Sequence, residues 1–556
     1  MSSKKKKKSN FLVQGSILAI SSIIVRIIGA VYRIPLTKII GDIGNDYYSN
    51  AYEIYNLLLL ISSYSLPLAV SKLVSARLAK GERKNAYRIF RGALVFAIIS
   101  GIVVATFTFV FSRFLTARLF NTPMSFFALR ALIPALIIVA ILGVLRGFFQ
   151  GNGTMIPTAI SQIAEQIINA IVSVGAAYFL FSYGKKIGAV LGDAKSYSAA
   201  YGAAGGTLGT GAGALTALVF MLMIFFMYRP VLKRQIRRDR YSKKESYRKI
   251  FYVLMMTIVP VILSTTVYNI SGILDQGIFK SPMLQHGLSA DVRSQMWGIF
   301  SGKYKVLTNV PIAIASAVAS SVTPGLSIAV ALGDKNEMKA KIETAIRFVM
   351  IVAFPCAIGM GVLASPILHF LFNGSSTESM TIATRLLQSG AVVIIFTSLS
   401  TLSNGLLQGI NRMKTPVINA VISLIIHLIS LIIMLQFFNL KIYAVIYSNI
   451  IFAFLMCLLN GMAIRKFIGY KQEIKRSFII PCISSILMGV VVYLVYSGIH
   501  KGLDNNKLGV VISIILGALV YGILLLAFKA LTEEEIKRLP KGNLILSFGK
   551  KIHLIK

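Results

Sequence analysis

The stretch LRGFFQGNGTMIPTAI, residues 145–160, returns in a related form at residues 402–418 as LSNGLLQGINRMKTPVI. Three residues of the first copy recur 258 positions later and its proline recurs one position further on: Gly147, Gln150, Gly151 and Pro157 correspond to Gly405, Gln408, Gly409 and Pro416. Both copies end one apolar segment and, after a turn, open another with a proline, which a helix tolerates in its first turn. The pattern predicts a duplicated helical hairpin.

A second, looser repeat supports the first. Pro67 lies in SLPLAVSKLVSARLAKGERKNA, and Pro311 lies in NVPIAIASAVASSVTPGLSIAVALGDKNEMKA. The later copy is eight residues longer between its proline and the turn that contains glycine and charged residues. The two repeats together indicate two homologous halves.

The composition excludes an ordinary soluble protein. Of the 556 residues, 56% are hydrophobic and only 14% are charged, whereas about 25% are charged in a typical soluble domain. Apolar runs of about 20 residues, the length that crosses a bilayer as a helix, recur from end to end. We therefore predict a polytopic membrane protein.

Hydropathy predicts an all-α integral membrane protein with fourteen transmembrane helices, arranged as two six-helix lobes and a final pair. The predicted spans lie near residues 11–40, 51–79, 88–112, 127–150, 156–182, 207–228, 250–275, 298–332, 342–371, 381–408, 415–437, 441–464, 477–498 and 508–529. The predicted parts are an N-lobe (1–228), a basic cytoplasmic linker (229–249), a C-lobe (250–465), a final helix pair (466–530) and a cytoplasmic tail (531–556). Each lobe holds six spans, so the repeats should be parallel, an arrangement typical of alternating-access transporters.

The placement of lysine and arginine predicts the orientation. Basic residues gather in the loops on the N-terminal side, including ten between Arg229 and Lys249, whereas the predicted outer loops at 41–50 and 373–380 have none. The positive-inside rule then places both termini in the cytoplasm. The net charge of +39 is therefore assigned to topology and to attraction to anionic membrane lipids, and no nucleic-acid partner is expected.

Basic residues inside the predicted spans point to an anionic substrate. A charge within the bilayer is costly and should face a wet cavity or a partner. The guanidinium group of arginine also suits a two-point grip on phosphate. The residues predicted to line a basic, substrate-binding cavity are Arg26, Arg33, Lys72, Lys303 and Lys305.

The intramembrane acids are few: Glu53, Glu165 and Asp275. Glu165 and Asp275 are candidates for ion or proton coupling, and Glu165 shares its helix face with Gln162 and Asn169. An equally good alternative is that Glu165 pairs with a basic residue across the bundle. No catalytic set, nucleotide-binding loop or metal-ligand cluster is found in the sequence, so an enzyme is not predicted.

Four features together resemble the MOP flippase superfamily: SSIIVRIIGAVYRIPLTKIIGDIG in the first helix, NVPIAIASAVASSVTPGLS in the eighth, NGLLQGINRMKTPV after the tenth, and the fourteen-span layout. Within it, the chain is similar to the MurJ and stage V sporulation protein B-like branch of polysaccharide biosynthesis proteins. The resemblance implies a MOP/MATE-like fold.

The resemblance implies a flippase of the bacterial plasma membrane for an undecaprenyl-pyrophosphate-linked sugar, with lipid II as the expected substrate. It further implies arginines that bind the pyrophosphate, a lateral gate between the first and eighth helices, and a lipid tail along the last two helices. No cofactor is expected. A Na+ or H+ gradient or the membrane potential would drive transport, and the cell-wall synthesis machinery is an expected partner.

The chain departs from the MurJ pattern in the first helix. That pattern has an arginine, a second arginine six residues later and then an acid, whereas Arg26 is followed here by Tyr32 and Arg33. The MurJ pattern also has an arginine in the eighth helix. This chain has no exact match to it, but Lys303 and Lys305 lie close to its position. The sodium site of some members is not clearly kept, because the eleventh span carries no acid.

Three other functions remain open from the sequence. A flippase for another undecaprenyl-linked saccharide, such as a teichoic acid or capsule unit, fits the same residues. A cation-coupled drug exporter would have acids rather than bases in its cavity. A membrane scaffold for cell-wall enzymes would not need Arg26 or Lys72.

Overall fold

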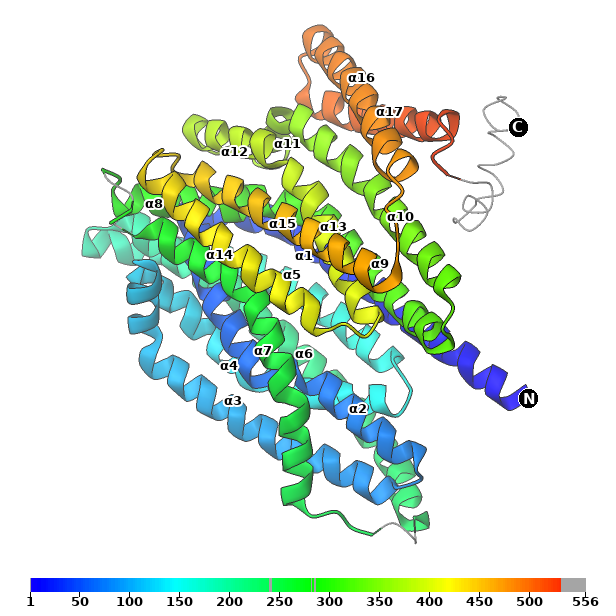
Figure 1. Cartoon of the computed structure of the whole chain (residues 1–556). Coiled ribbons are helices and arrows are strands. Elements are labelled where there is room, and N and C mark those ends of the chain that lie inside the picture. The colour runs from blue at the N-terminus through cyan, green and yellow to red at the C-terminus, as the bar shows by residue number, and fades with distance from the viewer. Residues whose placement is uncertain (1, 240–242, 282, 285–286, 532–556) are drawn as a thin grey trace. The chain divides into compact units, whose positions relative to one another are not determined.

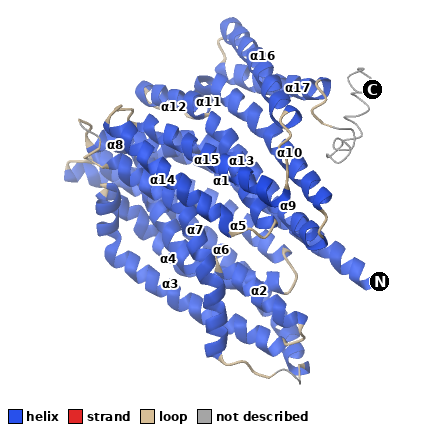
Figure 2. Ribbon diagram, viewed as in Figure 1, coloured by secondary structure: helices blue, strands red, loops and turns tan. Residues whose placement is uncertain are grey.

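A computed structural model describes residues 2–239, 243–281, 283–284 and 287–531. Within these ranges every regular element is helical, as Figure 2 shows. Twelve helical segments there are long and apolar enough to cross a membrane. The predicted all-α membrane architecture is therefore confirmed, whereas the number of fourteen spans stays a prediction. One of the twelve segments, Ile20–Ala79, covers two predicted spans.

The chain forms two compact units, Met1–Gly302 with Ile432–Lys441, and Lys303–Leu431 with Ile442–Lys556. The lobe boundaries expected from the repeat stay a prediction. The elements up to Ile299, of which the α-helices are labelled in Figure 1, are α1 (Ser2–Leu59), the π-helical turn η1 (Leu60–Tyr64), α2 (Leu66–Ala79), α3 (Arg83–Phe120), η2 (Pro123–Ser125), α4 (Phe126–Gly151), α5 (Ile156–Leu191), α6 (Ala194–Arg238), α7 (Tyr247–Lys280) and α8 (Ala290–Ile299). The later elements are η3 (Phe300–Tyr304), α9 (Lys305–Leu332), α10 (Lys335–Val362), α11 (Ala364–Leu371), α12 (Thr377–Gly390), α13 (Val392–Gly409), α14 (Lys414–Gln436), α15 (Ile442–Ile468), η4 (Lys475–Ile479), α16 (Ile480–Leu503) and α17 (Asn506–Ala527).

Gly41 turns the chain within α1. Its φ of 69° and ψ of −177° are non-helical, and the positive φ is readily adopted only by glycine. The segment after Gly41 is helical at once, so the prediction of a loop over residues 41–50 is wrong, and its position on the outer side stays a prediction. Tyr47, Tyr48 and Ala51 are buried, which explains why this polar-looking stretch folds as a packed helix.

The predicted basic linker is also largely helical. α6 continues to Arg238 and α7 begins at Tyr247, so only a short connection separates them. Arginine and lysine are good helix formers, and a run of them on an exposed helix has the same composition as a polar loop. The prediction of a linker over all of residues 229–249 is therefore wrong in its extent.

Glu245 in this connection is fixed to the turn between α2 and α3. Its carboxylate lies 2.8 Å from an Arg77 nitrogen. Its carbonyl oxygen accepts a hydrogen bond from Arg88 Nε at 2.9 Å, and its amide N–H donates to Asn85 Oδ1 at 3.1 Å. The Arg88 guanidinium also lies over the Tyr247 ring, 4.2 Å from its centre. The connection is thus held by charge, hydrogen bonds and a cation–π contact.

The glycines of the first repeat bring α4 against α2. A Cβ at Gly147 would lie 2.6 Å from the carbonyl oxygen of Pro67, and one at Gly151 would lie 3.0 Å from that of Ser71. The first distance is shorter than a carbon and an oxygen tolerate, and the second is at the lower limit of real contacts. Only glycine permits this backbone approach, as in the small-residue contacts of membrane helices.

The second repeat makes the same contact between α13 and α9. A Cβ at Gly409 would lie 3.3 Å from the Thr323 carbonyl oxygen, and one at Gly405 would lie 2.8 Å from Ala319 Cβ. Thr323 Oγ1 donates to the Gly405 carbonyl at 3.1 Å, and Ser327 Oγ donates to the Gly409 carbonyl at 2.9 Å. The repeated glycines therefore mark the same helix–helix contact twice.

The register of these contacts revises the second, looser repeat. Gly81 and Gly333 both end a helix with positive φ, and they are as far apart in the chain as Ser71 and Thr323. In this register Pro67 corresponds to Ala319 rather than to Pro311. The repeated feature is the glycine turn, and the prolines occupy different helical positions.

Replacing Gly147 with alanine tests the α2–α4 contact. We expect Gly147→Ala to lower the free energy of unfolding by about 1–3 kcal/mol, because the new methyl group would overlap the α2 backbone. Gly175→Ala is the matched control, since a Cβ there meets nothing within 4 Å. The free energy of unfolding of Gly175→Ala should be unchanged or higher by up to about 1 kcal/mol, because alanine favours the helix more than glycine does. Unfolding temperatures of the two purified variants give the answer, and equal values would contradict the contact.

Candidate functional site

Arg26 and Arg33 lie on one face of α1. They are seven residues apart, which is two helical turns and about 10 Å along the axis. Arg26 is exposed and Arg33 is partly buried. The Arg33 guanidinium lies over the Tyr48 ring, 4.4 Å from its centre. Two guanidinium groups on one helix face form a surface that can bind an anion.

Buried tyrosines support this arginine. Tyr32 and Tyr48 have their hydroxyl oxygens 3.4 Å apart, and the Tyr48 and Tyr52 rings have centres 4.5 Å apart. The Tyr52 hydroxyl is hydrogen-bonded to Thr210 of α6. Because the tyrosines are fixed by one another and by α6, the Tyr48 ring offers the Arg33 guanidinium a fixed surface.

Arg146 and Glu165 form an ion pair between α4 and α5. Arg146 Nη2 lies 2.7 Å from Glu165 Oε2, and Arg146 Nε donates to Ser161 Oγ at 2.9 Å. This is the pairing that the sequence left open as an alternative for Glu165. A coupling role for Glu165 stays a prediction, and such a role would have to act in the presence of this arginine.

The three predicted lysines lie in different surroundings. Lys72 is exposed on α2, and Lys305 is partly buried at the start of α9. Lys303 is only 1% exposed, and its Nζ donates to Ser379 Oγ of α12. Lys303 and Lys305 belong to the second unit. Their joining Arg26, Arg33 and Lys72 in one cavity therefore stays a prediction.

Asp275, the second predicted coupling residue, is 4% exposed on α7. Five residues further along α7, Lys280 forms a buried ion pair with Asp46 of α1, and its Nζ also donates to Asn50 Oδ1 at 3.2 Å. Both charged side chains are at most 2% exposed. Breaking such a pair by removing one partner is strongly destabilising, by about 3–5 kcal/mol. The sequence did not predict this pair, because its members are more than two hundred residues apart.

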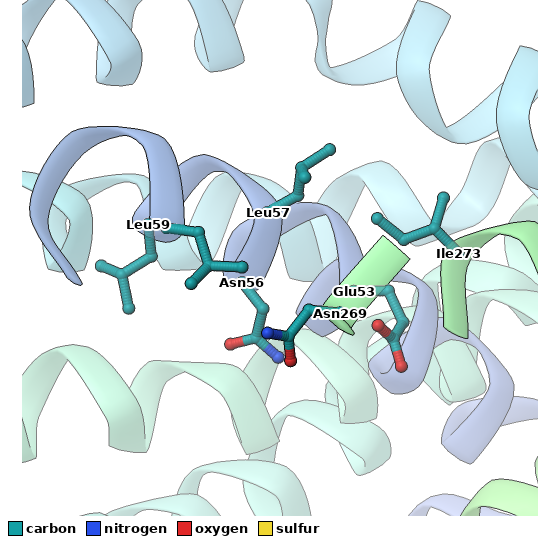
Figure 3. Close-up of a pocket in the computed structure, with 7 residues that line it drawn as sticks. Glu53, Asn56, Leu57, Leu59, Asn269 and Ile273 are labelled. Carbon is teal, nitrogen blue, oxygen red and sulfur yellow. The ribbon is translucent and has the colours of Figure 1, made fainter. Parts of the chain in front are cut away.

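A cavity of about 270 Å³ lies between α1 and α7. Its polar lining is Glu53, Asn56 and Asn269, and Figure 3 shows that the two amide groups point toward one another. Glu53 stood out in the sequence only as one of three intramembrane acids. The spacing of Glu53 and Asn56, which puts them on one helix face, was the available signal. Within the described residues, no group of three or more histidine, cysteine or acidic side chains could hold a metal ion.

Sequence comparisons identify relatives over most of the chain. The model of the polysaccharide biosynthesis protein family matches residues 12–330, and the MatE model matches residues 306–433. The lipid II flippase MurJ of Bacillus subtilis is 25% identical over 533 residues, which cover 92% of this chain and 94% of the relative. Stage V sporulation protein B of the same organism is 22% identical over 544 residues, covering 97% and 99%.

Solved structures with the same fold include a lipid II flippase MurJ in an inward closed conformation. Its TM-score is 0.64 at 17% identity, over 91% of this chain and 97% of that one. An inward-facing multidrug resistance MATE family transporter of the MOP superfamily has a TM-score of 0.66 at 14% identity, over 81% and 98%. The predicted MOP/MATE-like fold is confirmed.

A double-mutant cycle tests the Arg146–Glu165 pair. Arg146→Met and Glu165→Gln should each lower the unfolding temperature, because each leaves a half-buried polar partner unsatisfied. The double variant should lose less free energy of unfolding than the sum of the two single losses. The difference, which is the coupling energy of the pair, should be about 0.5–3 kcal/mol. The exposed Glu337–Lys341 pair of α10 is the control, with a coupling of about 0–1 kcal/mol. Additive losses at Arg146 and Glu165 would contradict the pairing.

Proposed function

The chain belongs to the polysaccharide biosynthesis protein family, and we propose that it is a lipid II flippase that moves the undecaprenyl-pyrophosphate-linked peptidoglycan precursor across the bacterial plasma membrane by alternating access. Its similarity to the lipid II flippase MurJ, over 94% of that protein's length, supports the substrate. Its relatives and structural neighbours are flippases and transporters rather than enzymes.

The observation that carries the proposal is the pair of guanidinium groups on one face of α1. Arg33 is stacked on Tyr48, so part of its orientation is fixed before a ligand binds. A guanidinium group can donate two parallel hydrogen bonds to a phosphate. A pyrophosphate carries enough oxygen atoms for both arginines, and the departure from the usual arginine spacing places Arg33 directly over the tyrosine.

The last two helices support a lipid-linked substrate. α16 exposes an apolar stripe at Ile483, Ile486, Val490 and Leu494, with spacings of three and four residues. α17 exposes Val511, Ile515 and Leu519 in the same way. Such stripes are stable in contact with hydrocarbon chains. We propose that these helices accompany the lipid tail while the head group crosses.

The energy source and the partners follow from the proposed substrate. We propose that a Na+ or H+ gradient or the membrane potential drives transport, that both termini are cytoplasmic, and that the chain works beside the cell-wall synthesis machinery. An anionic head group moving outward runs down the inside-negative potential, worth about 2.3 kcal/mol per charge per 100 mV.

A flippase for another undecaprenyl-linked saccharide is the second candidate. The chain is similar to stage V sporulation protein B over nearly its whole length, and a phosphate-binding surface on α1 does not select the sugar. A cation-coupled drug exporter is less well supported, because the α1 face carries bases rather than acids. The MatE match is also confined to residues 306–433.

Complementation tests the proposal. In a bacterium depleted of its own lipid II flippase, this chain should restore growth and the appearance of lipid II in the outer leaflet. Arg26→Ala and Arg33→Ala should each reduce flipping about tenfold or more, the loss of one charge-assisted phosphate contact. The flipping rate of Arg33→Lys should lie between those of the wild type and Arg33→Ala, because lysine keeps the charge but cannot donate two parallel hydrogen bonds.

Arg113→Ala is the control for these variants. Arg113 is an exposed arginine of α3 that lies over Phe126, so its loss should leave flipping unchanged. Membrane expression of every variant is measured beside flipping. No rescue by the well-expressed chain would remove lipid II as the substrate and favour the second candidate.

A further inference from the structure

The backbone at the end of α17 fixes the direction in which the chain continues. The Lys529 N–H donates to the Leu526 carbonyl at 3.1 Å, and the Ala530 N–H donates to the Leu525 carbonyl at 2.9 Å. Lys529 has a φ of 54°. These are the two hydrogen bonds and the left-handed residue of a Schellman turn. Lysine rarely adopts a positive φ, and Ala530 is fully buried, so the surrounding contacts hold this turn in place.

α17 runs antiparallel to α10 within the second compact unit. Near its start, Asn506 Nδ2 donates to the carbonyl of Pro366 in α11, the helix that follows α10, at 3.2 Å. Farther along, the Tyr521 hydroxyl donates to the carbonyl of Ile351 in α10 at 2.8 Å. Residue numbers rise on α17 as they fall from α11 to α10, so the end of α17 approaches the first half of α10.

A groove of about 660 Å³ between α9 and α10 lies where the chain leaves α17. Its apolar lining is Val318, Val322, Ala340, Phe348 and Leu531. The Phe348 side chain is 39% exposed, and Leu531 is the last residue that the structure describes. The volume lies within the roughly 300–1,000 Å³ of ligand pockets, so the groove has room for the side chains of a short segment.

The sequence after Leu531 has the signals of a short amphipathic helix. Thr532 and Glu535 match the capping box, in which a threonine is followed three residues later by a glutamate. Leu531 and Ile536 then occupy the two positions of the hydrophobic staple, which pack against one another at a helix start. Pro540 would end such a helix. Because Leu531 lines the groove, the staple places Ile536 beside it.

The length of this segment matches the groove. The lining residues of α10 run from Glu337 to Phe348, which is about 16 Å of helix. Residues 532–539, from the capping threonine to the residue before the proline, would span about 12 Å as a helix. Leu539 follows Ile536 by three residues, so a helix places both on one face. Two apolar side chains can therefore enter the groove together.

The order of charges along the segment matches the rim of the groove. Lys341 and Glu337 lie one turn apart on α10, with nitrogen and oxygen 2.9 Å apart and side chains 32% and 42% exposed. A segment that continues antiparallel to α10 passes Lys341 before Glu337. In the sequence, the acids Glu533–Glu535 precede the bases Lys537 and Arg538. Each charged group of the segment therefore meets the opposite charge on α10.

We propose that residues 532–539 of this chain bind in the groove between α9 and α10, with Ile536 and Leu539 against its apolar lining. The occupied groove joins the final helix pair to α9 and α10 through a second contact, in addition to the Tyr521 hydrogen bond. This contact does not depend on what the chain transports, so it goes beyond the proposed function.

Disulfide cross-linking in native membranes tests the proposal on the full chain, whose three native cysteines are first replaced by alanine. Ile536→Cys is combined either with Ser321→Cys of the groove lining or with Ser320→Cys, the exposed neighbour that does not line the groove. We expect the Ser321 pair to form an intrachain disulfide at least about tenfold faster than the Ser320 pair, because the bond requires Cα atoms within about 7 Å.

The accessibility of Ser321→Cys alone gives a second readout, in the same background. Replacing two apolar residues of the segment, Ile536→Glu with Leu539→Glu, should raise its rate of reaction with a water-soluble maleimide about tenfold, because the groove is then open to solvent. Lys541→Glu is the matched control. It changes the net charge by the same amount but lies beyond Pro540, so it should leave the rate unchanged.

Three results would overturn the proposal. The first is equal cross-linking of Ile536→Cys to positions 320 and 321. The second is a disulfide between two chains instead of within one, which would assign the groove to a second copy. The third is a Ser321→Cys reaction rate that Ile536→Glu with Leu539→Glu leaves unchanged, which would assign the groove to membrane lipid. Flipping of lipid II is measured separately and affects only the proposed function.

Discussion

A charge within the hydrocarbon must be met by a partner, and the interior of the first unit is arranged around this constraint. Arg146 is met by Glu165, Lys280 by Asp46, and Arg33 by the ring of Tyr48. These three contacts differ in how much positive charge they leave available to bind an anion. The two ion pairs are neutral overall and hold helices together, whereas a cation over an aromatic ring keeps its full charge. Arg33 therefore remains able to attract an anion, and the paired residues do not.

The close helix contacts are the second determinant of the fold. In both units a pair of glycines brings one helix backbone against another, and the hydroxyls of Thr323 and Ser327 add hydrogen bonds to the backbone in the second unit. In lipid, apolar burial gives helices little reason to associate, so short backbone distances and hydrogen bonds supply the specificity. This is why the glycines repeat in the sequence while the apolar residues around them differ.

The sequence predicted the helices well where hydropathy and glycine or proline act together. α5 begins at Ile156, as predicted from Pro157, and α13 ends at Gly409, one residue beyond the prediction. It failed at residues 41–50 and at the end of α6, because hydropathy reports the surroundings of a segment and not its backbone conformation. The shared face of Arg26 and Arg33 followed from their spacing. The partners of Lys280 could not be predicted, because they depend on which helices pack together.

The connection before α7 has a mechanical consequence. Glu245 is fixed to Arg77, Asn85 and Arg88, and the compact unit built on the first repeat extends through α7 and α8 to Gly302. A flexible linker would let α7 move independently of the α2–α3 turn. A segment held by an ion pair and several hydrogen bonds instead transmits movement from one to the other. The start of α7 should thus follow the α2–α3 turn rigidly.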